Sequence, residues 1–157
     1  MKYLDSSAFV KYYSQEYHEK GYTKIKELVN NAKDKKEIIL SSIILIPETI
    51  SAFDKWKRLK LLNEEDFDEL LGIFINDLKE LSNKSAVILE SINNFTVFFS
   101  IDSIIKHSLS FNDALHLYNA LLNKDKITQF ISSDKNLCKA AKAEGLNVFN
   151  PEENGKN

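Results

Sequence analysis

The sequence is poor in cysteine, proline and glycine, and each shortage excludes a class of protein. The single cysteine among 157 residues excludes an internal disulfide framework and a cysteine-based zinc site. Two prolines and four glycines leave little room for flexible linkers. No apolar run approaches the ~20 residues that cross a bilayer, and the short apolar stretch after Met1 stops at Asp5, so we expect no signal peptide. These absences favour a cytoplasmic protein.

The charge balance excludes whole-molecule attraction to nucleic acid or to anionic lipid. Twenty-one Lys and Arg residues stand against 23 Asp and Glu residues, for a formal net charge of −2. A phosphate backbone would therefore have to be held by a local basic patch or by a bound cation. With 43% hydrophobic residues, the length fits a single domain, and we predict one domain over residues 1–150 followed by a polar tail over residues 151–157.

Short apolar strands alternate with amphipathic helices along the chain. Strands without polar alternation are typical of a parallel sheet that is buried on both faces. Alternating strands and helices therefore predict an α/β fold with a mainly parallel sheet. The strands are expected at residues 2–4, 38–40, 96–99, 129–132 and 147–149, and the helices at residues 6–15, 19–32, from a cap at 41–42 to 61, 63–81, 110–123 and from 134 to 145.

Four acidic residues stand where a parallel sheet would gather them. Asp5 follows the first strand, Asp134 follows the strand FISS, and Glu48 lies in the first turns of the helix after IIL. Asp113 lies in the first turn of the helix that starts near Ser110. Ligands of open α/β sheets collect at the carboxyl ends of the strands. Neighbouring carboxylates raise one another's pKa, and an oxygen-only cluster suits a hard cation such as Mg²⁺ or Mn²⁺.

Three of the four carboxylates also have a purely structural explanation. Asp113 fits position N3 of a capping box that begins at Ser110. Asp134 can cap the last helix, and Glu48 is a favourable charge near a helix N-terminus. No structural need explains a carboxylate at Asp5, between an apolar strand and two serines. The hypothesis of a metal site therefore depends on the four residues together.

Four segments that span the chain resemble the PIN-domain family, specifically its small stand-alone members such as the VapC-type toxins. The segments are YLDSSAFVK, SSIILIPETISAF, SFNDALHLYNAL and FISSDKNLCKAAKAEGLNVFNP. The resemblance implies a three-layer α/β/α fold with a roughly five-stranded sheet, and a Mg²⁺- or Mn²⁺-dependent endoribonuclease. It also implies a homodimer and, for a toxin, a small antitoxin protein as partner.

The resemblance assigns roles residue by residue. It carries the catalytic and metal-binding acidic roles onto Asp5, Glu48, Asp113 and Asp134, and supporting roles onto Ser6 and Ser132. One segment departs from the family pattern, because only IDSIIKHSLSF separates the predicted strand TVFFS from Asp113. Asp102, at the start of that segment, is expected to be a helix N-cap or a solvated side chain.

Other residues are weaker candidates for contact with RNA. Arg58, Lys11 and Lys135 are plausible phosphate contacts, whereas Trp56 fits the core better than base stacking. His116 shares a helix face with Asp113 and is expected to be hydrogen-bonded beside the core, although a general-acid role is conceivable. An antitoxin would enter an apolar groove, for which we expect the helices at 43–60 and 63–81.

Four functions are alternatives to that of a toxin. A housekeeping RNA-processing nuclease would use the same chemistry, and a non-catalytic interaction domain would keep the fold without hydrolysis. A phosphoacceptor domain needs an acidic pair after the first strand, and a phosphatase needs Asp-x-Asp there. Ser6 and Ser7 follow Asp5 instead, which excludes both of these last classes.

Overall fold

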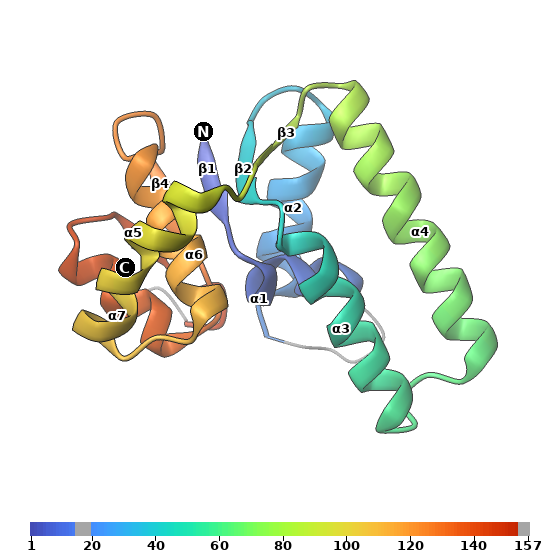
Figure 1. Cartoon of the computed structure of the whole chain (residues 1–157). Helices are drawn as coiled ribbons and strands as arrows, with labels where there is room; N and C mark the ends of the chain where they lie inside the picture. Colours follow the sequence, from blue (N-terminus) through green and yellow to red (C-terminus); the bar gives the residue numbers. More distant parts are fainter. Residues whose placement is uncertain (15–19, 154–157) are drawn as a thin grey trace.

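A five-stranded parallel sheet forms the middle layer of the molecule (Figure 1). The computed structural model describes residues 1–14 and 20–153. The strands are β1 (Lys2–Leu4), β2 (Ile39–Ser42), β3 (Val87–Glu90), β4 (Gln129–Ile131) and β5 (Val148–Phe149). Their order across the sheet is β3-β2-β1-β4-β5, and every neighbouring pair is parallel. All carboxyl ends therefore meet at one edge of the sheet.

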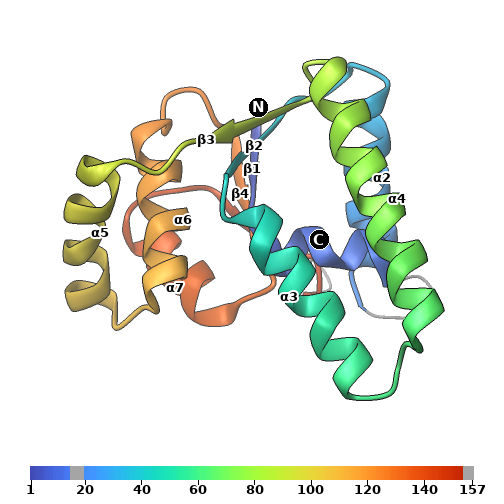
Figure 2. The ribbon, with the colours of Figure 1, turned by 45° about the vertical axis from the view of Figure 1, so that its right-hand side comes forward.

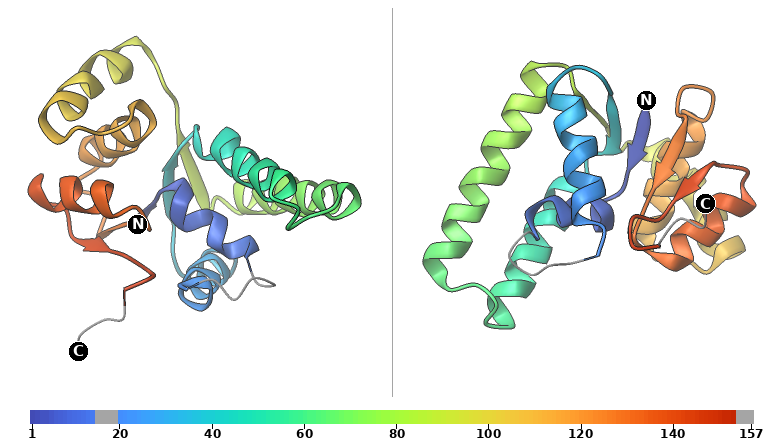
Figure 3. Two further views of the ribbon diagram at one scale, coloured as in Figure 1. Left: turned by 90° about the horizontal axis from the view of Figure 1, so that it is seen from below. Right: turned by 180° about the vertical axis from the view of Figure 1, so that it is seen from behind.

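Helices cover both faces of this sheet, so the predicted three-layer α/β/α fold is confirmed (Figure 2). The helices α3 and α4 form a long pair at one end of the molecule, and α5 is outermost at the other end, beyond α6 (Figure 3). The helical elements are α1 (Ser6–Phe9), the 3-10 helix η1 (Val10–Tyr13), α2 (Tyr22–Lys33), α3 (Leu45–Arg58), α4 (Glu64–Asn83), α5 (Asn94–His107), α6 (Phe111–Leu122) and α7 (Lys135–Ala143).

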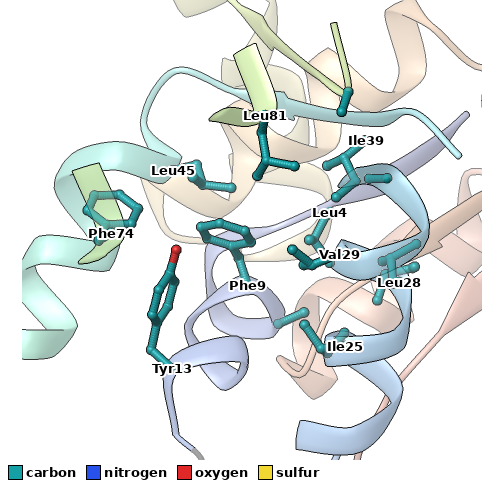
Figure 4. Packing of buried hydrophobic residues seen from close by; sticks show 14 of the residues in the cluster. Leu4, Phe9, Tyr13, Ile25, Leu28, Val29, Ile39, Leu45, Phe74 and Leu81 are labelled. Atoms are coloured by element: carbon teal, nitrogen blue, oxygen red, sulfur yellow. The ribbon is translucent and has the colours of Figure 1, made fainter. Parts of the chain in front are cut away.

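Each face of the sheet has its own hydrophobic core, because successive side chains of a strand point to opposite faces. Tyr3 of β1 belongs to the core under α6 and α7, whereas its neighbour Leu4 belongs to the core under α1, α2, α3 and α4. In the latter core, Phe9 packs beside Leu4 and Val29, and Tyr13 points toward Phe74 (Figure 4). Tyr13, Phe53 and Phe74 meet there edge to face, with ring centroids 5.3–5.8 Å apart.

The prediction of a strand at residues 96–99 is wrong, because these residues form the first turns of α5. Asn93 starts this helix with a capping box, in which its side chain accepts a hydrogen bond from the Thr96 N–H. The third strand is β3, which ends three residues before that cap. The segment that seemed shortened before Asp113 therefore contains the connection to α6 and the second half of the helix α5. Asp102 lies inside it as an exposed residue and is not its N-cap.

The prediction that Ser41 and Ser42 cap the next helix is also wrong. Both serines belong to β2, and the Ser41 hydroxyl donates a hydrogen bond to the Leu4 carbonyl 2.6 Å away. The helix α3 begins at Leu45 without a side-chain cap. The Ser41 hydroxyl thus finds its partner in the neighbouring strand, whereas the Ser42 hydroxyl is buried without a hydrogen-bond partner among the described residues. Small hydroxyl residues occur both in strands and at helix caps, and the sequence pattern did not distinguish the two.

The ends of two predicted helices, Gln15 and Glu19, lie outside the described residues, as do residues 154–157 of the predicted tail. The described beginning of that tail packs on α2. Lys24 donates hydrogen bonds to the carbonyl oxygens of Pro151 and Glu153. Gly21 has a φ of 92°, and a Cβ there would lie 2.9 Å from the Cβ of Pro151, so this contact requires glycine.

Candidate carboxylate site

The four acidic residues singled out in the sequence all lie at the start of a helix, either as its N-cap or in its first turn. Asp5 directly follows β1 and caps α1, and Asp134 follows β4 and caps α7. Glu48 lies in the first turn of α3, the helix that follows β2. Asp113 lies in the first turn of α6. Because β1, β2 and β4 are adjacent and parallel, three of these residues are delivered to one region by the topology alone.

Asp5 is a buried carboxylate with only 3% of its surface exposed. Its Oδ1 accepts a hydrogen bond from the Ala8 N–H at 3.1 Å, and the Ser7 hydroxyl lies 2.9 Å from Oδ1 and 3.1 Å from Oδ2. Burial raises the pKa of Asp5 from 3.8 to about 6, although the nearby His116 and these hydrogen bonds oppose the rise. A carboxylate that is costly to keep charged in this way gains most from a nearby cation.

A pair of serines connects Asp5 to Asp134. The Ser7 hydroxyl, which donates to Asp5, lies 3.4 Å from the hydroxyl of Ser132 and accepts a hydrogen bond from the Ser133 N–H at 3.0 Å. The Ser132 hydroxyl in turn accepts from the Asp134 N–H at 3.0 Å. Ser132 is thus a link between two of the carboxylate segments.

Glu48 is held by three donors from two other segments. Its Oε2 accepts from the Ser6 hydroxyl at 2.5 Å and lies 2.9 Å from Nε2 of His116. Its Oε1 accepts from the side-chain amide of Asn112 at 2.9 Å. Burial pushes the pKa of Glu48 upward, but the hydrogen bonds from His116, Ser6 and Asn112 outweigh it, and the pKa lies below its ordinary value. Glu48 is therefore a fixed anion.

His116 joins this network to the core beneath it. The imidazole is 1% exposed, and its Nδ1 lies 3.0 Å from the hydroxyl of Tyr3. Its Nε2 lies 3.1 Å from the Ser6 hydroxyl as well as beside Glu48. The prediction of a hydrogen-bonded histidine beside the core is confirmed. With both ring nitrogens engaged, His116 holds Glu48 in position.

Asp113 faces the other carboxylates from α6. The Ser110 hydroxyl donates to its Oδ2 at 2.7 Å, and the Asp113 N–H donates to the Ser110 hydroxyl at 3.2 Å, which confirms the predicted cap at Ser110. Burial raises the pKa of Asp113, and the negative charges of Asp134 and Glu48 raise it further, against the effect of Ser110 and His116. Asp113 therefore experiences the charge conflict expected among converging carboxylates.

The described residues hold no group of three or more His, Cys, Asp or Glu side chains that could hold a metal ion as they stand. The chemistry of the donors nevertheless fits a hard cation, since all four are carboxylates and two of them have raised pKa values. Asp5, Asp113 and Asp134 are the residues that could bind such an ion directly. Both oxygens of Glu48 are engaged by protein donors, which suits an indirect role better.

The three basic candidates lie in different environments. Lys11 is buried, and its ammonium lies 2.7 Å from Glu152, so its place is a structural ion pair. Arg58 pairs with Asp54 at the far end of α3, about 15 Å along the helix from Glu48. Lys135 is exposed and directly follows Asp134, so it alone of the three is available beside the carboxylates.

Three residues of this network were not singled out in the sequence: Tyr3, Ser7 and Asn112. Ser7 could have been found, because the second residue after an N-cap aspartate is a frequent partner of its side chain. Asn112 carried a weak signal as the neighbour of Asp113. Nothing in the sequence indicated Tyr3, because a tyrosine in a buried strand is ordinarily a core residue, and Tyr3 also stacks on Phe130 in the core.

Comparison with known proteins supports the fold. No family model matches the chain, and no curated protein matches its sequence. Among solved structures, the chain is similar to the crystal structure of PAE2754 from Pyrobaculum aerophilum, with 16% sequence identity and a TM-score of 0.55 over 96% of this chain and 90% of that chain. A likeness at this identity concerns the arrangement of helices and strands. It agrees with a three-layer α/β/α fold that extends over nearly the whole chain.

Proposed function

We propose that this protein is a divalent-metal-dependent endoribonuclease that hydrolyses RNA phosphodiester bonds. The observation that carries the proposal is the electrostatic coupling of acidic side chains from separate segments at one edge of the sheet. Asp113 is affected by both Asp134 and Glu48, and Asp5 is buried on the same network. Helix capping explains each aspartate singly, but it does not require their convergence, which is unfavourable without a cation.

The roles follow from the contacts of each residue. Mg²⁺ or Mn²⁺, when bound, would polarise the phosphodiester and lower the pKa of a bound water. Asp5, Asp113 and Asp134 are the proposed ligands, each still restrained by the helix cap in which it takes part. Glu48, kept anionic by its donors, has the indirect role of orienting the attacking water. Lys135 is the proposed phosphate contact.

A cytoplasmic toxin of a toxin–antitoxin pair is the biological role that we propose. A small antitoxin protein would then need a binding groove. The sequence suggested a groove between α3 and α4, whereas a hollow of about 560 Å³ lies over η1, α2 and α4. Its walls include Tyr12, Leu70 and Ile73, and its rim carries Asp66 and Glu69. A partner segment with apolar and basic side chains would fit this groove. A housekeeping RNA-processing nuclease would have the same site without this partner.

A non-catalytic interaction domain is the alternative from another class. Two observations favour it: the carboxylates do not form a ready-made metal group in the described residues, and the donors around Glu48 satisfy both of its oxygens. On this alternative the acidic residues are helix caps and hydrogen-bond acceptors only. Replacement of these residues would then change only the stability of the protein, because the parent protein would have no catalytic activity.

The deciding experiment measures cleavage of a labelled single-stranded RNA with Mg²⁺, with Mn²⁺ and with EDTA. We expect cleavage with either metal and none with EDTA. Asp5→Asn and Asp113→Asn should each lower the rate roughly 100-fold or more, because loss of a direct metal ligand costs more than loss of a residue that only holds a ligand in place. Asp68→Asn, which changes an exposed carboxylate of α4 with the same chemistry, is the matched control and should keep full activity.

Calorimetry with Mg²⁺ separates the two functions. The nuclease proposal requires binding by the parent protein and by Asp68→Asn, with weaker binding by the two site variants. Cleavage that survives in both Asp5→Asn and Asp113→Asn would contradict the assignment of the site. Absence of both metal binding and cleavage in the folded parent protein would favour the interaction domain.

A further inference from the structure

The hydroxyl of Tyr3 is a buried polar group that the packing of this residue does not need. The ring of Tyr3 is 0% exposed and stacks on Phe130 with centroids 5.3 Å apart, a contact that phenylalanine would make equally well. Burying a hydroxyl is costly unless the group is hydrogen-bonded. The Tyr3 hydroxyl lies 3.0 Å from Nδ1 of His116, whose Nε2 lies 2.9 Å from Oε2 of Glu48. It is thus two hydrogen bonds away from the carboxylate site.

These two hydrogen bonds join three elements of the fold. Tyr3 belongs to β1, His116 to α6 and Glu48 to α3, and Figure 1 shows α6 and α3 on either side of the carboxyl end of β1. A strand residue that is fixed by the sheet therefore contacts the helix residue that restrains Glu48. The effect of this connection depends on which of the atoms carry the protons.

The contacts of Nε2 require that this nitrogen carries a proton. Glu48 is a fixed anion, so its oxygens only accept hydrogen bonds. The Ser6 hydroxyl, 3.1 Å from Nε2, donates its own proton to Oε2 of Glu48 at 2.5 Å, and this leaves a lone pair of its oxygen for the ring. An unprotonated Nε2 would therefore face two acceptors. With a proton, Nε2 donates to Glu48 and lies beside the oxygen of Ser6.

The contacts of Nδ1 require the opposite. Burial raises the pKa of Tyr3 well above its ordinary value, and nearby carboxylates raise it further, so the phenol keeps its proton. Among the described residues, Nδ1 of His116 is the acceptor within hydrogen-bond distance of this hydroxyl. A proton on Nδ1 would leave the Tyr3 hydroxyl without an acceptor, which is unfavourable for a buried donor.

His116 is therefore a neutral imidazole in a single tautomer, with its proton on Nε2. The hydrogen bond made by one ring nitrogen sets the form of the other, and here the Tyr3 hydroxyl makes that bond. A neutral ring leaves Glu48 with its negative charge, because no imidazolium lies beside it to cancel that charge. The positive N–H end of the ring still favours the ionised carboxylate and holds its Oε2, while Asn112 holds Oε1.

We propose that Tyr3 is a positioning residue, which acts on Glu48 by fixing the tautomer of His116. The inference rests on the proposed nuclease function, in which Glu48 orients the attacking water. Tyr3 is fully buried beneath the site and acts only through His116. Without the Tyr3 hydroxyl, the imidazole can place its proton on Nδ1, and the lone pair of Nε2 then faces the charged Oε2 of Glu48. The carboxylate is displaced, and the water is oriented less well.

The first test determines the tautomer of His116 by ¹⁵N NMR of the histidine rings, in the full chain at about pH 7 without metal. In the parent protein the proton should be on Nε2. Tyr3→Phe removes only the hydroxyl and should shift a large part of the population to other forms. Tyr118→Phe is the matched control, because it removes a phenol hydroxyl from the same helix as His116, and it should leave the tautomer unchanged. The signals of His116 are those that are missing in His116→Gln.

The second test measures cleavage of the labelled single-stranded RNA with Mg²⁺. Tyr3→Phe should lower kcat roughly 10-fold or more, which is the usual effect of losing a partner that orients a residue of the site. KM should stay within about twofold, because no contact with RNA changes. Tyr118→Phe should keep the kcat of the parent protein. Rates are divided by the folded fraction from circular dichroism, so a loss of folded protein is not mistaken for a loss of kcat.

A double-mutant cycle shows whether Tyr3 acts through His116. The side-chain amide of His116→Gln can donate to Glu48 in place of Nε2, and an amide has no tautomer to fix. His116→Gln should therefore keep more activity than His116→Leu. In the His116→Gln background, Tyr3→Phe should change kcat by less than about twofold.

Three results would overturn the inference. One is a parent protein in which His116 is protonated on Nδ1, alone or together with Nε2, and this result does not require Tyr3→Phe to fold. Another is an unchanged kcat in folded Tyr3→Phe. The third is an equal loss of kcat with and without His116, because Tyr3 would then act independently of it. A parent protein that has the expected tautomer but cleaves no RNA instead contradicts the proposed function, and with it the role of Tyr3 in catalysis, while the assigned tautomer stands.

Discussion

Replacement of Asp5 by asparagine is expected to stabilise the metal-free protein. Asp5 is buried, and the loss of solvent around its carboxylate raises its pKa from 3.8 to about 6 on folding. Above that pH the folded protein has to hold a poorly solvated negative charge. The asparagine side chain has nearly the same shape and no charge, and its oxygen can still accept the hydrogen bond from the Ala8 N–H.

The magnitude follows from the pKa shift. A rise of about two units corresponds to a destabilisation of about 3 kcal/mol at pH 7, where Asp5 is ionised in both states. The bond from Ser7 to the second oxygen is altered in Asp5→Asn, at a cost of about 1 kcal/mol. We therefore expect a net gain of about 2 kcal/mol in the free energy of unfolding at pH 7.

The stability difference between Asp5→Asn and the parent protein should depend on pH. Because the folded pKa is above the unfolded one, the folded state binds the proton more tightly, and the parent protein loses this stability as the pH rises from about 4 through about 6. The advantage of Asp5→Asn should therefore be absent at pH 4 and complete at pH 7. Urea unfolding of both proteins in EDTA at several pH values measures the difference, with Asp68→Asn as the control.

Two results would refute this reasoning. One is a difference between Asp5→Asn and the parent protein that does not change with pH, because the raised pKa would then be absent. The other is a loss of stability in Asp5→Asn at pH 7 in EDTA. Added Mg²⁺ gives a further check. A cation bound by Asp5 should raise the free energy of unfolding of the parent protein, so that it approaches or exceeds that of Asp5→Asn.

Two further substitutions test the parts of the structure that surround the site. His116→Leu should lower the free energy of unfolding by about 2–3 kcal/mol, because it leaves the buried hydroxyl of Tyr3 and the carboxylate of Glu48 without a partner. It should also raise the pKa of Glu48, which NMR titration of the glutamate carboxyl measures directly. Phe53→Ala should cost about 3–5 kcal/mol in urea unfolding, because Phe53 is fully buried among aromatic rings, whereas Leu59→Ala, at an exposed position, should change stability by less than about 0.5 kcal/mol.

The sheet and its order of elements were largely predictable because buried parallel strands have a simple signature. The runs that became β1, β2, β4 and β5 are short, apolar and separated by helical periodicity, so only their ends were misjudged. The long helix α4 was predicted within two residues at its C-terminal end, because its acidic first turn and apolar stripe agree with each other.

The third strand was assigned to Thr96–Phe99, because that segment resembles a strand more strongly than Val87–Glu90 does. The segment Val87–Glu90 is a partly exposed edge strand, and its apolar run Val87–Leu89 is only three residues long, directly after the long helix α4. The segment Thr96–Phe99 is β-branched and aromatic, which favours a strand when it is considered alone. Here the capping box at Asn93 and the packing of Thr96 and Ser100 on the body of the protein select a helix. Tertiary context overrode local propensity, and it left the aromatic side chains facing outward.

The carboxylate positions could be predicted, whereas the contacts that restrain them could not. A residue that directly follows a parallel strand lies at the edge of the sheet where ligands bind, whatever its neighbours are. The positions of Asp5 and Asp134 at this edge therefore follow from topology alone. The bonds that hold Glu48 depend on how far α6 is rotated and advanced relative to α3, since Asn112 and His116 both belong to α6. No periodicity encodes that geometry. The same rotation of α6 sets the position of Asp113 relative to Asp134, so packing between two helices decides whether the acidic residues can act as one site.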